Sequence, residues 1–413
     1  MKFYARSLGA ALTSPVSRNK VRLLFGARQV GKTMLLRHLA GAATAHVVDL
    51  GVAATRRRFE ADPDAFRREA LALPRRIATV VVDEVQKVPA LLDEVQALFD
   101  ESPRRHQFFL TGSSARRLRR HSANLLPGRC HVFRLAPVCA WESVCGEPVD
   151  WPGALPPAAP GPAPAPPFPR QGLERTLLYG SLPGVRAEAP ATAAATLHAY
   201  VENFLEEEVR REALVRDLGA FSGFLRLAAL ESGRQLNLTK LSQESGVPAS
   251  TLKTHYQVLE ETFAGGFVRP YARRARRRLL VTPRFLFFDV GVRNAAAGLP
   301  FDAGLLAVEG PALLEQWVGQ ELRARAAILG RGHEVSFWRT AGGAEVDWVW
   351  ESPALDVPVE VKWTTRPAPG DARHLHAFLD EHPDRARQGL LVCRCPEPQR
   401  LSERVLAVPW DRF

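Results

Sequence analysis

The octapeptide at residues 26–33 has residue types at a spacing suited to binding a polyphosphate. It reads GARQVGKT and matches the pattern G-x-x-x-x-G-K-[ST] in full. Such a turn aims several backbone N–H groups and the N-terminus of the following helix at one point. Lys32 is expected to reach the β- and γ-phosphates, and Thr33 is expected to ligate Mg²⁺. The predicted nucleotide-binding residues of this loop are Gly26, Ala27, Arg28, Gln29, Val30, Gly31, Lys32, Thr33 and Met34.

A pair of carboxylates supplies the groups expected to bind the metal ion and to activate water. Asp83 and Glu84 follow the apolar, β-branched run 77–82, which is typical of a strand buried on both faces of a parallel sheet. Because α/β sheets bind ligands at the carboxyl ends of their strands, Asp83 is predicted to lie beside the phosphate loop. We expect Asp83 to hold Mg²⁺, directly or through water, and Glu84 to polarise the attacking water as a general base. The alternative is that the pair caps the next helix.

The elements that position these groups alternate between strand and helix. An apolar strand at residues 21–25 precedes the loop and a helical pattern at residues 34–39 follows it. These flanks argue against a chance match in a glycine-containing turn. The apolar run 46–50 is expected to form a strand that separates the loop strand from the Asp83 strand, an order typical of ATPases whose catalytic Glu follows the magnesium Asp. An amphipathic stretch at 63–73 follows.

A further strand is predicted at residues 106–110, after a helix at 90–99, and it ends in the hydroxyl-rich sequence Thr-Gly-Ser-Ser. Ser113 in this sequence is a candidate for contacting the γ-phosphate or the attacking water. A turn that caps the following helix is an equally good interpretation of the same residues. The order of strands and helices predicts an α/β fold that binds its ligand at one edge of a parallel sheet.

Four segments resemble the AAA-family ATPases of bacteria and archaea, in which a long, mostly uncharacterised C-terminal region follows the core. They are GARQVGKT at 26–33, VVDEVQ at 81–86, LTGSS at 110–114 and LPGR at 126–129. Further residues that fit the same group are Tyr4, Arg6, Pro137 and Glu142. The resemblance implies an ATP-hydrolysing P-loop core that assembles through neighbouring subunits. It also implies that Arg129 is an arginine finger or an intersubunit contact.

Composition limits the remaining possibilities. The chain has 413 residues, of which 46% are hydrophobic, and this is enough for two or three domains with proper cores. No apolar stretch is long enough to cross a membrane, and the N-terminus lacks the apolar core of a signal peptide. The five cysteines fit neither zinc spacing nor a disulfide framework. These features predict a cytoplasmic protein with no membrane partner.

The net charge of +11 indicates a polyanionic partner. Only seven of the 55 basic residues are lysines, and codon bias can explain that skew. Codon bias does not explain the excess of positive charge. Arginine clusters at 56–58, 116–120 and 273–278 are therefore candidate phosphate contacts, and a solvated surface arginine is the alternative for any one of them.

The middle of the chain contains a linker and a helical region. Residues 149–170 are rich in Pro, Ala and Gly and are predicted to form a linker or loop, and a helical segment follows at 171–235. Residues 236–300 resemble a winged helix, because two short helices flank a turn at Gly246 and a basic hairpin follows at 273–281. The residues expected to point outward from the second helix are Ser250, Thr251, Lys253 and Thr254. The pattern favours DNA contact, although winged helices also serve as protein-binding modules.

The C-terminal segment, residues 301–413, carries a second set of residues suited to catalysis. Glu315 lies in a helical pattern and Asp347 in a predicted strand, while Glu360 and Lys362 lie two residues apart on one face of another strand. This arrangement resembles the PD-(D/E)xK nuclease fold. The implied chemistry is Mg²⁺ ligation by Asp347, Glu360 and Glu315, with Lys362 orienting or activating water. The same fold also survives as a nucleic-acid-binding relic that does not cleave.

These features predict an α/β protein with an AAA-type P-loop ATPase core over residues 1–148, a helical and winged-helix middle, and a nuclease-like α/β domain. The expected function is hydrolysis of ATP, with ATP and Mg²⁺ as cofactors, coupled to binding or remodelling of DNA, including branched or foreign DNA. The predicted catalytic residues are Lys32, Glu84 and Arg129. Two alternatives remain: an ATP-regulated, Mg²⁺-dependent DNA nuclease, and an ATP-switched signalling or scaffold protein whose winged helix binds protein. A homo-oligomer is compatible with each.

Overall fold

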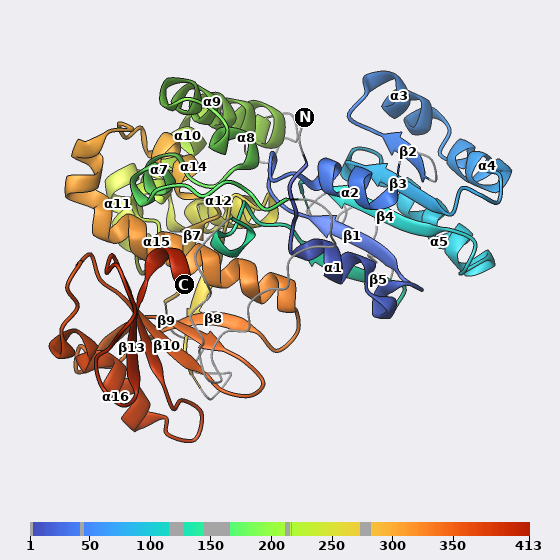
Figure 1. The fold of residues 1–413 in the computed structure, drawn as a ribbon. Helices are drawn as coiled ribbons and strands as arrows, with labels where there is room; N and C mark the ends of the chain where they lie inside the picture. Colours follow the sequence, from blue (N-terminus) through green and yellow to red (C-terminus); the bar gives the residue numbers. More distant parts are fainter. Residues whose placement is uncertain are drawn as a thin grey trace. The chain divides into compact units, whose positions relative to one another are not determined.

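The computed structural model describes residues 3–41, 45–114, 128–143, 166–210, 215, 217–272 and 282–413. Most of the linker predicted at 149–170, the arginine cluster 116–120 and the basic hairpin 273–281 lie outside the described residues. The described residues form two compact units (Figure 1). Unit 1 contains the chain up to residue 136 together with 166–168 and 261–263, and unit 2 contains the rest.

Unit 1 is built on a five-stranded sheet with the strand order β2-β3-β4-β1-β5 (Figure 1). Every neighbouring pair of strands is parallel. The strands are β1 (Val21–Phe25), β2 (Ala45–Asp49), β3 (Thr79–Asp83), β4 (Gln107–Gly112) and β5 (Cys130–Arg134). β1 is buried along its whole length and β3 at all but its first residue, as expected of apolar strands covered on both faces.

Along the chain β2 lies between β1 and β3, as expected of the run 46–50, whereas within the sheet the strand between β1 and β3 is β4. Within the sheet, β2 lies at the edge beyond β3. The sequence shows only that β2 comes between β1 and β3 along the chain, and chain order does not determine the order of strands in a parallel sheet. Phe25 pairs with Gly112 and Val82 pairs with Leu110, so the carboxyl ends of β1, β4 and β3 meet at one edge.

The helices of unit 1 pack on this sheet and on one another. They are α1 (Leu8–Thr13), α2 (Lys32–Ala40), α3 (Ala53–Ala61), α4 (Asp64–Ala72) and α5 (Leu91–Glu101), with 3₁₀ turns η1 (Pro15–Ser17) and η2 (Val85–Lys87). α2 packs against β3 and β4, and α4 packs against α5. The core between sheet and helices includes Phe59, Phe66, Val80, Val82 and Leu110. Burial of these apolar side chains is what makes the short strands stable as a sheet.

The first half of unit 2 is helical. Its helices are α7 (Leu173–Tyr179), α8 (Pro183–Arg186), α9 (Pro190–Asn203), α10 (Leu218–Leu230), α11 (Leu238–Ser245), α12 (Ala249–Glu261) and α14 (Val290–Ala297), and a π-helical segment covers Phe204–Arg210. α14 packs against α7, α9 and α10. Gly246, with φ +69°, ends α11 in the left-handed conformation that favours glycine. α11 and α12 occupy the positions of the two helices expected on either side of Gly246.

An eight-stranded sheet, β12-β13-β11-β10-β9-β8-β6-β7, spans the rest of unit 2. The strands are β6 (Gly265–Pro270), β7 (Arg284–Phe287), β8 (Glu334–Arg339), β9 (Glu345–Glu351), β10 (Val357–Val361), β11 (Gly389–Cys393), β12 (Gln399–Arg400) and β13 (Val405–Pro409). β6 pairs antiparallel with β7 and parallel with β8. The strands after α12 therefore share a sheet with the C-terminal segment.

Two helices cover the two faces of this sheet. Trp348 in β9 donates its Nε1–H to the backbone oxygen of Glu315 in α15 (Ala303–Leu329), at 3.0 Å. Its neighbour Val349 packs in a core cluster with Phe378 of α16 (Arg373–Glu381). Because successive strand residues point to opposite faces, α15 and α16 lie on opposite sides of the sheet. The remaining 3₁₀ turns of unit 2 are η3 (Ala140–Glu142), η5 (Pro369–Ala372) and η6 (Trp410–Arg412).

Within the described ranges, no helix combines the length and the apolar character that crossing a lipid bilayer requires.

Candidate functional site

The loop between β1 and α2 requires glycine at two positions. Gly26 has φ +157°, and a Cβ at this position would lie 2.4 Å from the backbone oxygen of Leu135. Gly31 has φ +95° and is the N-cap residue of α2. Side chains are disfavoured at both places, at Gly26 mainly by the close backbone and at Gly31 by the left-handed conformation. The result is a tight turn that leads directly into the N-terminus of α2, as phosphate binding requires.

Lys32 lies inside this loop. It is the first residue of α2 and only 5% exposed. Its ammonium donates hydrogen bonds to the backbone oxygens of Gly26 and Ala27, each at 2.9 Å. The positive charge is therefore held at the centre of the turn, where it can neutralise a polyphosphate.

Arg6 supports the loop from the N-terminal segment. Its Nη1 donates to the backbone oxygen of Val30 at 2.7 Å, and its Nη2 donates to the backbone oxygen of Ala136 at 2.6 Å. The side chain is buried. Arg6 was expected only to fit the AAA group, and these two contacts were not predicted, because the partners lie 24 and 130 residues away along the chain.

Asp83 lies at the end of β3, next to Thr33 of α2. The Thr33 hydroxyl donates to Asp83 Oδ2 at 2.7 Å, so the two oxygens are close enough to share one hard cation. On its other oxygen, Oδ1, Asp83 accepts a hydrogen bond from the hydroxyl of Thr111, at the end of β4. The Thr111 hydroxyl also accepts from the backbone N–H of Glu84 at 2.9 Å. One hydroxyl thus contacts the carboxylate of Asp83 and the backbone of Glu84, and the oxygens of Thr33 and Asp83 are of the kind that Mg²⁺ prefers.

Glu84 is held in an unusual conformation beside Asp83. Its φ of +60° and ψ of 45° lie in the left-handed region, which few residues other than glycine adopt. Its Oε2 accepts hydrogen bonds from Gln86 Nε2 at 2.5 Å and from the Ser113 hydroxyl at 3.1 Å, and Gln86 also donates to Ser113 at 2.9 Å. Glu84 stands at the N-cap of η2 but makes no side-chain capping bond, so the capping alternative does not describe it.

The other predicted residues of unit 1 lie at different distances from this centre. Arg28 is half-buried, whereas Gln29 and Met34 are exposed, and Gln29 has φ +62°. Arg129 precedes β5, and its backbone oxygen accepts from Val21 N, at the start of β1. Arg129 therefore lies at the amino end of β1, whereas the phosphate loop follows the carboxyl end of the same strand. The first and last residues of β1 are about 13 Å apart. Arg129 donates to Asp100 at 2.6 Å, a surface pair.

The structure brings the four predicted residues of the C-terminal segment together. Glu360 in β10 accepts from Lys362 at 2.7 Å. Asp347 in β9 accepts from the backbone N–H of Val361 at 2.8 Å, and Glu315 on α15 neighbours both carboxylates. Burial raises the pKa of Glu315 to about 8 and that of Glu360 to about 7, and in each case the charge of Asp347 adds to the effect. Burial also raises the pKa of Asp347 itself.

The Mg²⁺ site that the nuclease-like pattern implied at these residues stays a prediction. In the part of the chain that the structure describes, no group of three or more His, Cys, Asp or Glu side chains is placed to hold a metal ion. A buried arginine, Arg284 of β7, donates to Glu315 at 2.9 Å and pairs with Glu345. A guanidinium therefore contacts Glu315 and Glu345 in this acidic cluster.

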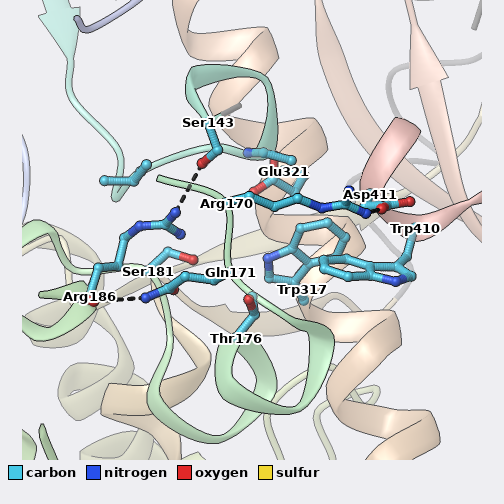
Figure 2. Close-up of a pocket in the computed structure, with 12 residues that line it drawn as sticks. Ser143, Arg170, Gln171, Thr176, Ser181, Arg186, Trp317, Glu321, Trp410 and Asp411 are labelled. Carbon is cyan, nitrogen blue, oxygen red and sulfur yellow. Dashed lines mark hydrogen bonds and ion pairs between the residues drawn. The ribbon is translucent and has the colours of Figure 1, made fainter. Parts of the chain in front are cut away.

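A separate small pocket lies elsewhere in unit 2 (Figure 2). Its volume of about 20 Å³ is enough for one water molecule. Figure 2 shows the indoles of Trp317 and Trp410 side by side along it, with Glu321 above them. Glu321 accepts from the backbone N–H of Ala140 at 2.9 Å, and burial raises its pKa to about 7. None of its lining residues was predicted to be functional.

Family comparisons bear directly on unit 1. Residues 18–144 match the family model of an AAA domain. This match supports an AAA-type ATPase at the N-terminus and suggests ATP binding. It covers the phosphate loop, both carboxylates, Thr111 and Ser113. The AAA domain therefore contains every residue that converges at the sheet edge except Arg6.

The rest of the chain matches two families whose function is unknown. Residues 170–303 match one domain of unknown function (DUF8612), and residues 311–413 match another (DUF4143). Two relatives described as uncharacterized proteins, one from Mycobacterium bovis and one from Mycobacterium tuberculosis, are each 25% identical over 411 residues. The alignment covers 99% of this chain and 84% of each relative. The similarity to these two relatives thus extends through both units, but it indicates no activity for unit 2.

Proposed function

We propose that the AAA domain binds ATP with Mg²⁺ and hydrolyses its terminal phosphoanhydride bond. The observation that carries this proposal is the convergence of Thr33, Asp83 and Glu84 at one sheet edge, where the Thr111 hydroxyl links the two carboxylate positions. The phosphate loop lies at the same edge, because it follows β1 directly. The family match over residues 18–144 supports the same conclusion.

Each residue has a role that follows from its contacts. Lys32 and the backbone N–H groups of the loop hold the phosphates, and the oxygens of Thr33 and Asp83 hold Mg²⁺. When bound, the ion neutralises charge on the phosphate oxygens. Glu84 accepts a proton from the attacking water at a carboxylate oxygen, as a general base. Gln86 and Ser113 orient that carboxylate, since both donate to its Oε2.

Two variants separate binding from chemistry. Lys32→Ala is expected to lose both ATP binding and turnover, because the only lysine of the loop is removed. Glu84→Gln is expected to bind a fluorescent ATP analogue normally while its turnover falls about 10²- to 10⁴-fold, the usual contribution of a general base. Asp93→Asn, an exposed carboxylate on α5, is the matched control and should leave both properties unchanged. Wild-type turnover in Glu84→Gln would refute the assignment.

Arg129 can serve only the active site of a neighbouring subunit, because it lies at the opposite edge of its own sheet. We therefore propose it as a finger or contact supplied in trans within a homo-oligomer. Arg129→Ala should lower turnover, and mixing it with Lys32→Ala should restore part of the loss, since a Lys32→Ala subunit still supplies Arg129. The matched control is Arg104→Ala, another exposed arginine of unit 1. Full turnover in Arg129→Ala would exclude the role.

A second proposal is that unit 2 binds DNA through α12. Three observations support it: α11 and α12 are joined by a turn at Gly246, an antiparallel pair β6–β7 follows, and Ser250, Lys253 and Thr254 are exposed on α12. This order is that of a helix-turn-helix with a wing. The net charge of +11 favours a polyanionic partner.

Salt dependence decides between DNA and a protein partner. Affinity for labelled duplex and four-way DNA, measured by anisotropy, should fall steeply as salt rises if several phosphates are neutralised. Lys253→Ala should weaken binding and reduce the salt slope by about one. Lys240→Ala on α11, where the lysine is paired with Glu244 at 3.6 Å, is the control with the smaller expected effect. Absence of salt-dependent binding would favour the protein-binding alternative.

A further inference from the structure

Arg284 is buried at the acidic cluster of unit 2. It is the first residue of β7, and its side chain is only 5% exposed. Nη1 donates to Glu315 Oε1 at 2.9 Å and to the backbone oxygen of Asp347 at 3.2 Å, while Nη2 pairs with the carboxylate of Glu345. One guanidinium therefore connects α15 with β9.

Two aromatic rings hold the guanidinium in this position. Its Cζ lies 4.5 Å from the ring centroid of Phe337 in β8 and 5.5 Å from that of Trp348 in β9. Both rings are fully buried. A planar guanidinium suits such a place, because it stacks on aromatic faces while its N–H groups reach carboxylates in the plane. Arg284 is thus fixed by packing as well as by charge.

Two other oxygens of the cluster accept hydrogen bonds from nitrogen donors, whereas Glu360 Oε2 is buried and makes no hydrogen bond with the described residues. Asp347 Oδ2 accepts from the Val361 N–H at 2.8 Å, and Glu360 Oε1 accepts from Lys362 at 2.7 Å. Mg²⁺ requires oxygen ligands in near-octahedral geometry, whereas a guanidinium offers only donors and repels a second cation. The described residues accordingly contain no metal-holding group of carboxylates here.

The cluster gathers four carboxyl groups, those of Glu315, Glu345, Asp347 and Glu360, around the cationic side chains of Arg284 and Lys362. A pocket of about 400 Å³ lies beside the cluster and is lined by Arg284, Glu315, Glu345 and Asp347. An ion from solvent therefore has access to these carboxylates. Without Arg284, their repulsion would have no fixed counter-charge on α15 and β9.

We propose that Arg284 is the resident cation of this cluster and occupies the position that a divalent metal ion would otherwise take. In the native chain the cluster is then a structural ion-pair network that joins β7 to α15 and β9, and it binds no Mg²⁺ or Mn²⁺. Replacing Arg284 by a neutral residue creates a divalent-cation site. This inference does not depend on ATP hydrolysis, because every residue it uses lies in unit 2.

Binding of Mn²⁺ to the full-length, nucleotide-free protein tests the proposal. Free Mn²⁺ is measured by electron paramagnetic resonance for the wild type, Arg284→Gln, Arg284→Lys, Asp347→Asn and the double variant Arg284→Gln/Asp347→Asn. Circular dichroism establishes that each variant is folded. Arg284→Lys is the matched control, because it keeps a positive charge at the same position.

The expected result is one additional Mn²⁺ site in Arg284→Gln, at least tenfold tighter than any binding by the wild type and lost in the double variant. The wild type, Arg284→Lys and Asp347→Asn should bind Mn²⁺ alike. A folded Arg284→Gln protein that gains no site overturns the proposal. So does wild-type Mn²⁺ binding that disappears in Asp347→Asn, and this comparison remains decisive if Arg284→Gln does not fold.

Discussion

The hydroxyl of Thr111 gives the sharpest test of how unit 1 is organised. It donates to Asp83 and accepts from the backbone N–H of Glu84 at 2.9 Å, and Thr111 is only 1% exposed. Thr111→Val removes this hydroxyl and keeps the size and branching of the side chain. The lost bond to a carboxylate costs about 1.5–3 kcal/mol, and the N–H of Glu84 loses its acceptor. If that cost falls on the transition state, kcat decreases about 10- to 150-fold.

Steady-state ATPase assays and binding of a fluorescent ATP analogue measure the two effects separately. The phosphate loop is unchanged in Thr111→Val, so analogue affinity should stay within about threefold of the wild type while kcat falls. Thr111→Ser keeps the hydroxyl and should recover most of the activity. Ser114→Ala is the matched control, since Ser114 is buried nearby and its hydroxyl has no hydrogen-bond partner among the described residues.

Two outcomes would refute the reasoning about Thr111. If the folded Thr111→Val protein turns over ATP at the wild-type rate, the hydroxyl does not position Asp83 or Glu84. If Thr111→Ser is as slow as Thr111→Val, the methyl group rather than the hydroxyl carries the effect. Thermal unfolding of each variant shows whether a loss of activity is a loss of folded protein.

Two further predictions concern the stability of unit 2. Burial raises the pKa of Asp289 from 3.8 to about 6 although its carboxylate accepts from the Ser181 N–H at 2.7 Å. The folded state then binds more protons than the unfolded state between pH 4 and 6, so the free energy of unfolding should fall by roughly 2–3 kcal/mol as pH rises through this window. Asp289→Asn should flatten that slope in urea titrations, and an unchanged slope would contradict the assignment. A Cβ at Gly319 would lie 2.5 Å from the Trp348 ring, so Gly319→Ala should lower the free energy of unfolding by about 1–3 kcal/mol. Gly223→Ala in α10, where a Cβ meets nothing within 4 Å, is the control and should be neutral or stabilising by up to about 1 kcal/mol.

The sequence was informative about unit 1 wherever the chemistry is local. The loop residues and the Asp83–Glu84 pair follow from one motif and one strand end, and the structure places Thr33 beside Asp83 as expected. The network of Gln86, Ser113 and Glu84 could not be predicted in the same way. It depends on β4 lying next to β3, and the sequence does not determine which strands are neighbours.

Unit 2 shows the same limit over longer distances. The spacing of Asp347, Glu360 and Lys362 predicted strands that carry these residues, and the structure has β9 and β10 there. Arg284 was not predicted to join them, because it lies 31 residues before Glu315 and belongs to a strand expected in a separate winged-helix segment. Only the pairing of β6 with both β7 and β8 places it at the cluster.

The two acidic sites of the chain also show why carboxylates at strand ends do not by themselves predict a metal ion. Asp83 accepts hydrogen bonds from the hydroxyls of Thr33 and Thr111, which are neutral and leave its negative charge available to a cation. In the cluster around Asp347, the guanidinium of Arg284 instead contacts Glu315 and Glu345, and the ammonium of Lys362 contacts Glu360, so the protein itself supplies positive charge. A hard cation competes with a hydroxyl donor easily, because the hydroxyl can turn and present its lone pairs as a ligand. It competes poorly with a buried, fixed guanidinium, which has no lone pair to offer. The groups that neutralise a carboxylate, rather than the carboxylate alone, therefore determine that Mg²⁺ is expected in unit 1 and not in unit 2.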